Sequence, residues 1–398
     1  MSLNSTSSGN RIHIGFFGIR NAGKSTLVNK LTNQEVSLVS DHKGTTTDPV
    51  KKSMELLPLG PVVIIDTAGF DDEGDLGELR RKKSYRVLDE MDIVVLVLDA
   101  RNDHLLDEEL DFLENLRSRR TPYIIIENHT DEAAPHSFAE LKDNEQIIYI
   151  NSEKDDMSKL KEALMKLASK KSEAFVVSDL IPTKSTVVLV IPIDESAPKE
   201  RIILPQQMVL RDLLDHNCKI ICCQPAELSE VLTANKEVSL VITDSQAFGQ
   251  VSKVVPKDIL LTSFSILLAR YRGSLDTQLE GVDALKKLQD NDKVLIAEAC
   301  THHRQCNDIG SVKIPGWIKS YTGKEIDFEY ASGNDFPEDL SKYKVVIHCG
   351  GCMINGKEMQ SRVKHCKEKG VPIVNYGMAI ALFNGILDRS LEILLTGN

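Results

Sequence analysis

The sequence predicts an α/β fold, in which mostly parallel sheets are covered by helices on both faces. Short apolar runs rich in β-branched residues alternate with helical patterns along the chain. Strands that are apolar throughout are typical of parallel sheets buried on both sides. The length of 398 residues fits two or three domains of roughly 150 residues each.

The bulk composition narrows the possible classes of function. The chain is 41% hydrophobic and 27% charged, as in ordinary globular proteins. Its net charge of −11 argues against nucleic acid or an anionic membrane as a partner, and no apolar run approaches the ~18 residues that span a bilayer. Residues 1–10 lack a signal-peptide pattern and are predicted to form a disordered arm. We therefore expect a cytoplasmic protein, whose eight cysteines serve metal binding or packing rather than disulfides.

Residues 11–172 are predicted to form the first domain, built on a mostly parallel sheet. Its helical candidates include KSTLVNKLT and KLKEALMKLAS. Its strand candidates are IHIGFFG, VVIIDTAG, DIVVLVLD, PYIIIENH and QIIYINS.

Residues 178–265 are predicted to form a second and smaller α/β domain. Its strand candidates are TVVLVIPID, KIICCQ, VSLVITD and DILLTS, and MVLRDLLDHN is its clearest helix. With about four strands and one or two helices, this segment has little core of its own. One way to complete its core is to continue the sheet through a partner subunit.

Residues 270–398 are predicted to form a third α/β domain. The helix SRVKHCKEKG ends at Gly370, a typical helix stop, and LEGVDALKKLQ is a second helix. The strand candidates are KVLIAEAC, KVVIHCG and VPIVNYG.

A phosphate-binding loop follows the first predicted strand. GIRNAGKS, residues 18–25, matches G-x-x-x-x-G-K-[ST] in the required context between a strand and a helix. Backbone N–H groups of such a loop surround phosphate oxygens at the positive end of a helix. Lys24 can reach the terminal phosphates, and the Ser25 hydroxyl can hold Mg²⁺. The predicted phosphate-binding residues are Asn21, Ala22, Gly23, Lys24, Ser25 and Thr26.

Two further motifs complete the predicted phosphate site. DTAG ends the strand VVIID, so Asp66 can hold Mg²⁺ through water and the Gly69 N–H can contact the last phosphate. GTTTD, residues 44–48, supplies a threonine that can cap the magnesium. Thr46 is our choice, with Thr45 as the alternative.

NHTD, residues 128–131, resembles the N-K-x-D motif with which small GTPases read guanine. The Asp131 carboxylate can accept both N–H donors of guanine, which adenine does not offer, and Asn128 supports it. His129 stands where that family has lysine, which bears on base affinity more than on base identity. Ser152, in NSEK, stands where a last guanine-contacting loop is expected, although the match is poor.

Together these motifs resemble the translation-factor-like GTPases, especially the Era and tRNA-modification branch. Phe70 follows DTAG where a Ras-type switch has its water-positioning glutamine. The resemblance implies that Asn21 helps to bind an activating K⁺, which supplies the charge that an arginine finger supplies elsewhere. It also places Glu78 near a water-orienting glutamate, with a solvated carboxylate as the alternative. We expect a slow GTPase.

A group of soft ligands follows two predicted strands of the third domain. Cys300 and His302 end one strand, and His348, Cys349 and Cys352 end another, in HCGGC. The carboxyl ends of neighbouring parallel strands converge, and two glycines allow the loop to turn tightly. Three thiolates suit zinc or an iron–sulfur cluster, so Cys3His zinc and a 4Fe-4S cluster both remain open. Reduced thiols packed in a core are the structural alternative.

The combination of a GTPase domain, a middle segment, C-x-H and H-C-x-x-C resembles the HydF family of FeFe-hydrogenase maturation GTPases over nearly the whole chain. The resemblance implies a 4Fe-4S cluster on Cys300, Cys349 and Cys352, with a fourth position open to Glu298, His302, His348 or an exchangeable ligand. It implies a scaffold or carrier for the di-iron precursor of the hydrogenase. It further implies two radical-SAM maturases and apo FeFe hydrogenase as partners, and a homodimer formed by the middle domain.

Other functions remain open at the level of sequence. An RNA-processing or ribosome-associated GTPase with a structural zinc site would need a basic or aromatic surface, and neither is clear in the third domain. A binding scaffold with a vestigial GTPase would lack K⁺-stimulated turnover. A redox enzyme is less favoured, because no flavin or second-cluster motif is present.

Overall fold

The computed structural model describes residues 9, 11–32, 50–67, 69, 85–119, 121–129, 138–168, 175–193, 202–299, 308–333, 335–351 and 354–396. Its contacts group into two compact units. We call Thr6–Ser172 the N-terminal unit and Glu173–Asn398 the C-terminal unit. Each unit is built on parallel sheets with helices on both sides, so the predicted α/β class is confirmed.

The N-terminal unit contains a six-stranded sheet in the order β2-β3-β1-β4-β5-β6. All neighbouring pairs are parallel except β2 with β3. The five strands that the sequence predicted are confirmed. The strands are β1 (Ile12–Phe17), β2 (Val50–Leu56), β3 (Gly60–Asp66), β4 (Ile93–Asp99), β5 (Tyr123–Asn128) and β6 (Ile147–Ile150).

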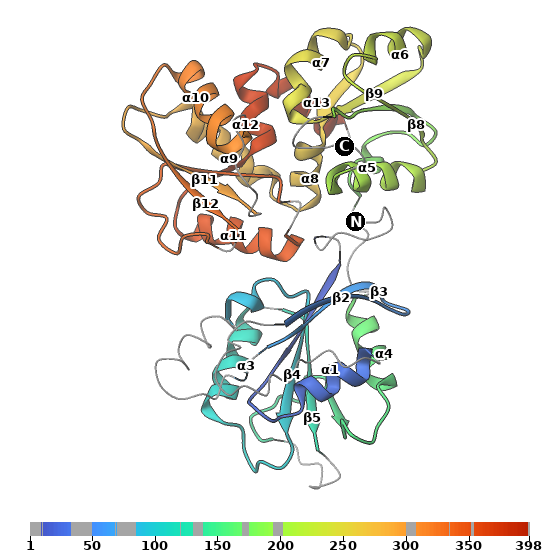
Figure 1. Ribbon diagram of the computed structural model, residues 1–398, viewed down its shortest axis with the longest axis vertical. Helices are drawn as coiled ribbons and strands as arrows, with labels where there is room; N and C mark the ends of the chain where they lie inside the picture. Colours follow the sequence, from blue (N-terminus) through green and yellow to red (C-terminus); the bar gives the residue numbers. More distant parts are fainter. Residues whose placement is uncertain are drawn as a thin grey trace. The chain divides into compact units, whose positions relative to one another are not determined.

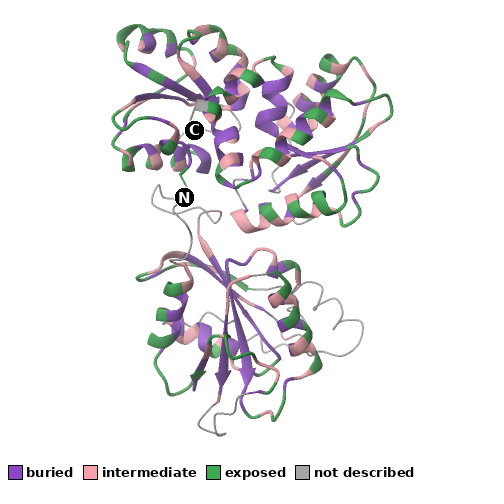
Figure 2. Ribbon diagram, turned by 180° about the vertical axis from the view of Figure 1, so that it is seen from behind, coloured by how far each residue is buried: buried purple, intermediate pink, exposed green. Residues whose placement is uncertain are grey.

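Helices flank this sheet on both sides. Figure 1 shows α3 (Asp107–Arg119) on one side and α1 (Lys24–Thr32) and α4 (Ser158–Ala168) on the other. The central strand β4 is buried at every residue, and Figure 2 shows the central strands as the buried part of the unit. A sheet covered in this way presents its loops at the carboxyl ends of the strands, where ligands bind in such folds.

The strand β2 was not predicted from the sequence. Its sequence, VKKSMEL, alternates exposed and half-buried residues up to a buried Leu56. It lies at the edge of the sheet and pairs antiparallel with β3. An edge strand with charged residues carries only a weak hydrophobic signal, which explains the omission.

The C-terminal unit contains two four-stranded parallel sheets, ordered β10-β9-β7-β8 and β12-β11-β13-β14. The seven predicted strands are confirmed, and β12 was missed. The strands are β7 (Thr186–Val190), β8 (Lys219–Cys223), β9 (Val238–Thr243), β10 (Leu260–Ser263), β11 (Lys293–Glu298), β12 (Asp327–Ser332), β13 (Val345–His348) and β14 (Ile373–Asn375).

The helices of the C-terminal unit outnumber the prediction, which expected one or two in the middle segment. Three of them, α9, α11 and α5, correspond to predicted helices, and Gly370 follows α11 with a φ of 66°. The helices are α5 (Leu204–Asp215), α6 (Leu228–Ala234), α7 (Phe248–Val254), α8 (Phe264–Tyr271), α9 (Leu275–Lys286), α10 (Ile314–Thr322), α11 (Gly356–Glu368), α12 (Tyr376–Phe383) and α13 (Leu387–Thr396), with the short turns η2 (Ser178–Leu180) and η3 (Ser245–Ala247) and the π-helix η4 (Ile309–Lys313).

One hydrophobic core joins the two sheets of the C-terminal unit. It contains residues from the middle segment, such as Val188 and Phe248, together with residues from the last segment, such as Ile296 and Met378. Helix α12, apolar on nearly every face, contacts α8 and η3 as well as α9 and α10. A helix that is hydrophobic all round is typically buried in this way.

The last helix of the chain returns to the middle segment. α13 packs on β10, and the Thr262 hydroxyl donates to the carbonyl of Ser390 at 2.9 Å. The same chain therefore supplies part of the core that the middle segment lacks on its own. Whether the sheet also continues through a partner subunit stays a prediction, as do the boundaries 11–172, 178–265 and 270–398. Residues 266–269, between the last two predicted domains, lie within α8.

No helix in the described part of the chain is both long enough and apolar enough to cross a membrane.

Candidate nucleotide and metal sites

The predicted phosphate-binding loop connects β1 to α1. The Lys24 side chain is buried, and its ammonium donates to the carbonyl oxygens of Gly18 at 2.9 Å and Ile19 at 2.5 Å. The ammonium therefore lies inside the loop, at the N-terminus of α1, where the helix dipole also favours an anion. The arrangement fits a group that receives phosphate oxygens.

Asp66 and Ser25 meet beside this loop, although they are far apart in the sequence. The Ser25 hydroxyl donates to Oδ2 of Asp66 at 2.6 Å. Burial raises the pKa of Asp66, while the Ser25 hydrogen bond and the Lys24 charge oppose the rise. Oδ1 of Asp66 is buried and makes no hydrogen bond. A hydroxyl next to an unsatisfied carboxylate oxygen fits Mg²⁺, a cation that prefers oxygen ligands.

Asn128 joins the phosphate loop to the predicted base-reading motif. Its side chain is fully buried at the end of β5. The Nδ2 atom donates to the carbonyl of Ala22 at 2.8 Å, and Oδ1 accepts from the Ser152 N–H at 2.8 Å. One amide thus links three of the segments that the sequence singled out, including the NSEK loop, whose match to the family pattern was poor.

Gly23 shows why this position requires glycine. Its φ is 90°, and a Cβ atom there would lie 2.0 Å from Nδ2 of Asn128 and 3.3 Å from the Ser152 hydroxyl. A side chain would therefore push the phosphate loop away from β5.

His129 occupies the position of the family's lysine. It has a φ of 63°, and its Nε2 is buried without a hydrogen bond. The Oγ of Ser152 is likewise buried and unbonded. Both atoms remain available to a ligand at this edge of the loop.

The remaining nucleotide predictions are only partly covered by the structure. Asn21 is exposed with a φ of 62°, and Thr26 is exposed on α1. Gly69 is half-buried. The other predicted residues, Thr45, Thr46, Glu78 and Asp131, lie outside the described residues.

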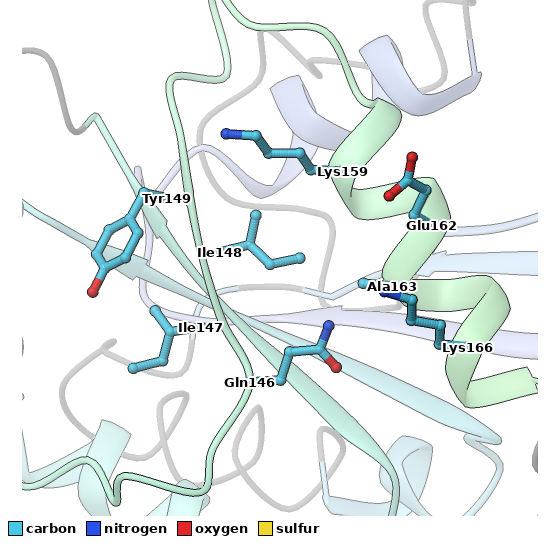
Figure 3. Close-up of a pocket in the computed structure, with 8 residues that line it drawn as sticks. All are labelled: Gln146, Ile147, Ile148, Tyr149, Lys159, Glu162, Ala163 and Lys166. Carbon is cyan, nitrogen blue, oxygen red and sulfur yellow. The ribbon is translucent and has the colours of Figure 1, made fainter.

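An open surface pocket of the N-terminal unit lies elsewhere. Figure 3 shows it between β6 and α4, with Tyr149 and Lys159 among its lining residues. None of the predicted nucleotide residues lines it. It therefore plays no part in the site described above.

In the C-terminal unit, β11 and β13 are parallel neighbours, as the metal-site prediction requires. His348 is in register with Ala297, and the Cys349 N–H donates to the carbonyl of Ala297 at 2.9 Å. The Cys349 sulfur accepts from the N–H groups of Ala299 at 3.1 Å and Gly351 at 3.4 Å. N–H donors directed at sulfur favour the thiolate, which is the form that binds metal.

His348 does not point an available nitrogen at a metal in this structure. It is fully buried, with Nδ1 2.7 Å from the carbonyl oxygen of Cys349 and Nε2 3.0 Å from Nη1 of Arg362. Burial and the Arg362 charge lower the pKa of His348 to about 3. Both ring nitrogens of His348 are therefore engaged within the protein, and its assignment as a fourth ligand stays a prediction.

Arg362 was not singled out from the sequence. It is buried on α11 and donates to the Glu358 carboxylate at 2.6 Å and to the carbonyl of Gly333 at 2.7 Å. The i,i+4 spacing of Glu358 and Arg362 was visible in the sequence. Their burial beside His348 was not.

Glu298 ends β11, two residues before Cys300 in the sequence, and is buried. Its Oε1 accepts from the Tyr376 hydroxyl at 3.1 Å, and a Cβ on Gly310, in the π-helix η4, would lie 2.7 Å from the same oxygen. Burial, with the Glu298 charge, raises the pKa of Tyr376 well above its usual value. Tyr376 is a second residue that the sequence did not indicate.

The other predicted metal ligands, Cys300, His302 and Cys352, lie outside the described residues. Within the described ranges, no group of three His, Cys, Asp or Glu side chains is placed to hold a metal ion. The ligand set therefore stays a prediction, of which the structure places one thiol, Cys349.

Comparisons with known families cover most of the chain. The family model described as the hydrogen maturase F dimerization domain matches residues 176–273, and the one described as the hydrogen maturase F tetramerization domain matches residues 276–393. Together the two cover more than half of the chain. The chain belongs to the hydrogen maturase F family. Residues 13–129 match the model described as a 50S ribosome-binding GTPase, so this HydF chain begins with a P-loop GTPase domain.

The curated relatives that resemble this HydF chain include GTPases, each matched over less than half of the chain. The tRNA modification GTPase MnmE of Nitrosomonas europaea is 31% identical over 159 residues, 39% of this chain and 35% of the relative. The GTPase Der of Nautilia profundicola is 28% identical over 185 residues, covering 44% of this chain and 40% of the relative. The chain thus spans about a third of the length of the curated relatives it matches.

Among solved structures, Aquifex aeolicus Era bound to GDP and aluminium fluoride is similar to this chain, with 16% identity and a TM-score of 0.34. The match covers 57% of this chain and 98% of the Era chain.

Proposed function

We propose that this chain hydrolyses GTP, holds a 4Fe-4S cluster on Cys300, Cys349 and Cys352, and carries the di-iron precursor during maturation of FeFe hydrogenase. The observation that carries the proposal is the Cys349 sulfur, which receives two backbone N–H groups at the carboxyl end of β13, in a chain of the HydF family.

The N-terminal unit supplies the nucleotide chemistry. Lys24, now bonded to loop carbonyls, exchanges them for the terminal phosphate oxygens and offsets the charge that develops there. Ser25 and Asp66 would hold Mg²⁺ together with Thr46, and the metal would supply positive charge beside the phosphates. Asp131 selects guanine, while the buried Asn128 keeps the base-reading segment against the phosphate loop.

Turnover is slow and stimulated by K⁺. Asn21, exposed at a positive φ, would help to hold K⁺, which would supply charge in place of an arginine finger. Glu78 is proposed to orient the attacking water. The comparison of turnover in KCl with turnover in NaCl tests this directly, because equal rates in the two salts would remove the K⁺ assignment.

The C-terminal unit supplies the metal site. Cys349 is presented by the ladder between β11 and β13, and the glycines after it let the chain turn so that Cys352 can face the same cluster. At the fourth position, Glu298, His302, His348 or an exchangeable ligand would complete the set of ligands that hold the cluster. An exchangeable ligand at that position would allow the di-iron cargo to attach and leave.

The two sites communicate only if GTP binds two states of the protein unequally. In this proposal the nucleotide changes the affinity for a partner, either the two radical-SAM maturases that load the chain or the apo FeFe hydrogenase that receives the cargo. Both C-terminal family models are named for self-association, which supports a homodimer or a larger homo-oligomer.

The first test is EPR of the anaerobically reconstituted, dithionite-reduced protein, with iron, zinc and sulfide quantified on the same sample. A reduced 4Fe-4S signal with about four irons per chain supports the proposal. Stoichiometric zinc without a cluster would identify the site as a structural zinc site and would favour an RNA-processing GTPase instead.

Three variants separate the two sites. Cys349→Ser abolishes the cluster and maturation but leaves GTP hydrolysis intact, while Cys222→Ser, which changes an exposed thiol on β8, leaves both unchanged. Lys24→Ala removes GTP turnover without altering the cluster spectrum. Full maturation by Cys349→Ser would refute the cluster assignment.

A further inference from the structure

A buried arginine from the middle segment reaches the loop that follows Cys349. Arg272 directly follows α8 and is 8% exposed. Its Nη1 donates to the carbonyl of Gly350 at 2.9 Å, and its Nη2 donates to those of Gly351 at 3.1 Å and Ile354 at 3.4 Å. One guanidinium therefore holds three carbonyls across the segment that contains Cys352.

Neighbouring contacts fix the backbone of Arg272 on both sides. The Arg272 N–H closes the last turn of α8 on Leu268 at 3.0 Å, and its carbonyl accepts from Nε2 of Gln360, on α11, at 3.2 Å. Gly351 has a φ of 65°, and a Cβ atom there would lie 2.8 Å from Nη1 of Arg272. Glycine at position 351 therefore leaves room for the Arg272 guanidinium.

The planar fork of arginine suits this task. It can donate several hydrogen bonds in a fixed geometry, whereas a lysine ammonium acts as a point charge. Arg272 therefore fixes the positions of several loop carbonyls at once.

We propose that Arg272 is a positioning residue, which holds the HCGGC loop in the shape that presents Cys349 and Cys352 to the metal and links the middle segment to the metal site. The proposal rests on the proposed function, because it assumes that this loop carries the cluster. Arg272 lies within the match to the dimerization domain, and the loop lies within the match to the tetramerization domain. A change in the middle segment can thus reach the cluster through one side chain.

A second arginine provides a matched control. Arg389, on α13, donates to the carbonyls of Val255 at 3.0 Å and Pro256 at 2.6 Å, in the connection between α7 and β10. It performs the same chemistry on backbone carbonyls, but on a segment that carries no predicted metal ligand. Arg389→Gln therefore measures the general effect on the C-terminal unit of removing an arginine that donates to backbone carbonyls.

The experiment compares Arg272→Gln, Arg272→Lys and Arg389→Gln with the wild type after anaerobic reconstitution. It measures the rate of iron release to a chelator and the EPR line shape of the reduced protein. Removal of groups that orient metal ligands typically weakens metal binding about 10- to 100-fold, so Arg272→Gln should release iron faster by about that factor and show an altered line shape. Arg272→Lys should recover part of the loss, and Arg389→Gln should match the wild type.

The outcomes separate this proposal from the proposed function. If the wild type binds no cluster, the proposed function itself fails. If the wild type holds a cluster and Arg272→Gln behaves like Arg389→Gln, the proposed function stands and the role of Arg272 is overturned. If neither Arg272 variant folds, as judged by circular dichroism and gel filtration, Arg272 is a residue of global stability and the proposal is also overturned.

Discussion

Asn128 is the residue on which the nucleotide site depends most in this structure. Its amide contacts Ala22 in the phosphate loop and Ser152 in the loop after β6. The sequence indicated Asn128 through the NHTD motif, but assigned it only a supporting role for Asp131. The structure adds that Asn128 organises the site before any base is bound.

We predict that Asn128→Ala lowers the free energy of unfolding of the N-terminal unit by about 1–3 kcal/mol, because a buried carbonyl and a buried N–H lose their partner. Nucleotide affinity should fall as well, measured with a fluorescent guanine nucleotide. Asn115→Ala is the control, since Oδ1 of Asn115 is buried without a hydrogen bond and its loss should cost below about 0.5 kcal/mol. Equal destabilisation by the two variants would contradict the bridging role.

Gly23 and Gly60 form a matched pair, because both have a φ of 90° but only Gly23 has close neighbours. Gly60→Ala should lower the free energy of unfolding by about 1–2 kcal/mol through backbone strain alone. Gly23→Ala should lower the free energy of unfolding by more than that. It should also abolish nucleotide binding, because the new Cβ atom would clash with the Asn128 side chain. Thermal unfolding with and without nucleotide measures both effects. Retained binding in Gly23→Ala would show that the loop can move aside.

At the scale of elements, α11 shows that oppositely charged residues with i,i+4 spacing can form a largely buried ion pair as well as an exposed one. The pair Glu358–Arg362 and the pair Arg211–Asp215 both have i,i+4 spacing on helices. The side chains of the first are 14% and 7% exposed, and those of the second are 76% and 60% exposed. The first also reaches His348 beside the metal loop, so α11 supports that loop as well as covering the sheet.

We predict that Arg362→Gln destabilises the C-terminal unit by about 1–3 kcal/mol, because it removes a donor to the half-buried Glu358 carboxylate and to the Gly333 carbonyl. Arg211→Gln should leave the stability nearly unchanged, as is usual for exposed pairs. Urea unfolding of both variants provides the comparison. A small effect of Arg362→Gln would mean that water or a rearranged side chain satisfies Glu358.

The two strands that the sequence missed, β2 and β12, each lie at an edge of a sheet, whereas the edge strands β6, β8, β10 and β14 were predicted from their apolar runs. Central strands such as β4 and β11 contain long apolar runs, which are visible in the sequence. The edge strands β2 and β12 have sequences VKKSMEL and DFEYAS, whose polar residues face solvent on the open side. A strand that is buried on one side only gives a weaker pattern, and edges often carry charge.

At the scale of the whole molecule, the contacts group the chain into two compact units. The two sheets of the C-terminal unit share one core, and α13 returns from the end of the chain to cover β10. The middle segment and the last segment are therefore expected to unfold together, even though two family models divide them.

We predict two unfolding transitions for the full-length protein. GDP with Mg²⁺ should raise the unfolding midpoint of the N-terminal unit only. At a ligand concentration of about 100 Kd, binding stabilises that unit by about 2.7 kcal/mol. Differential scanning calorimetry with and without nucleotide measures this, and Lys24→Ala serves as the control that does not respond. A shift of both transitions would instead reveal direct coupling between the units.

The sequence by itself determined the α/β class, the central strands, the phosphate loop and the thiol-rich loop. Each of these features is encoded by a short stretch of neighbouring residues. Tertiary structure decided the rest. It brought Ser25 to Asp66 and Asn128 to Ala22, engaged both nitrogens of His348, and placed Arg272 and Arg362 beside the metal loop. These contacts join residues distant in the chain, and a side chain's partner across such a distance depends on how the sheets and helices pack.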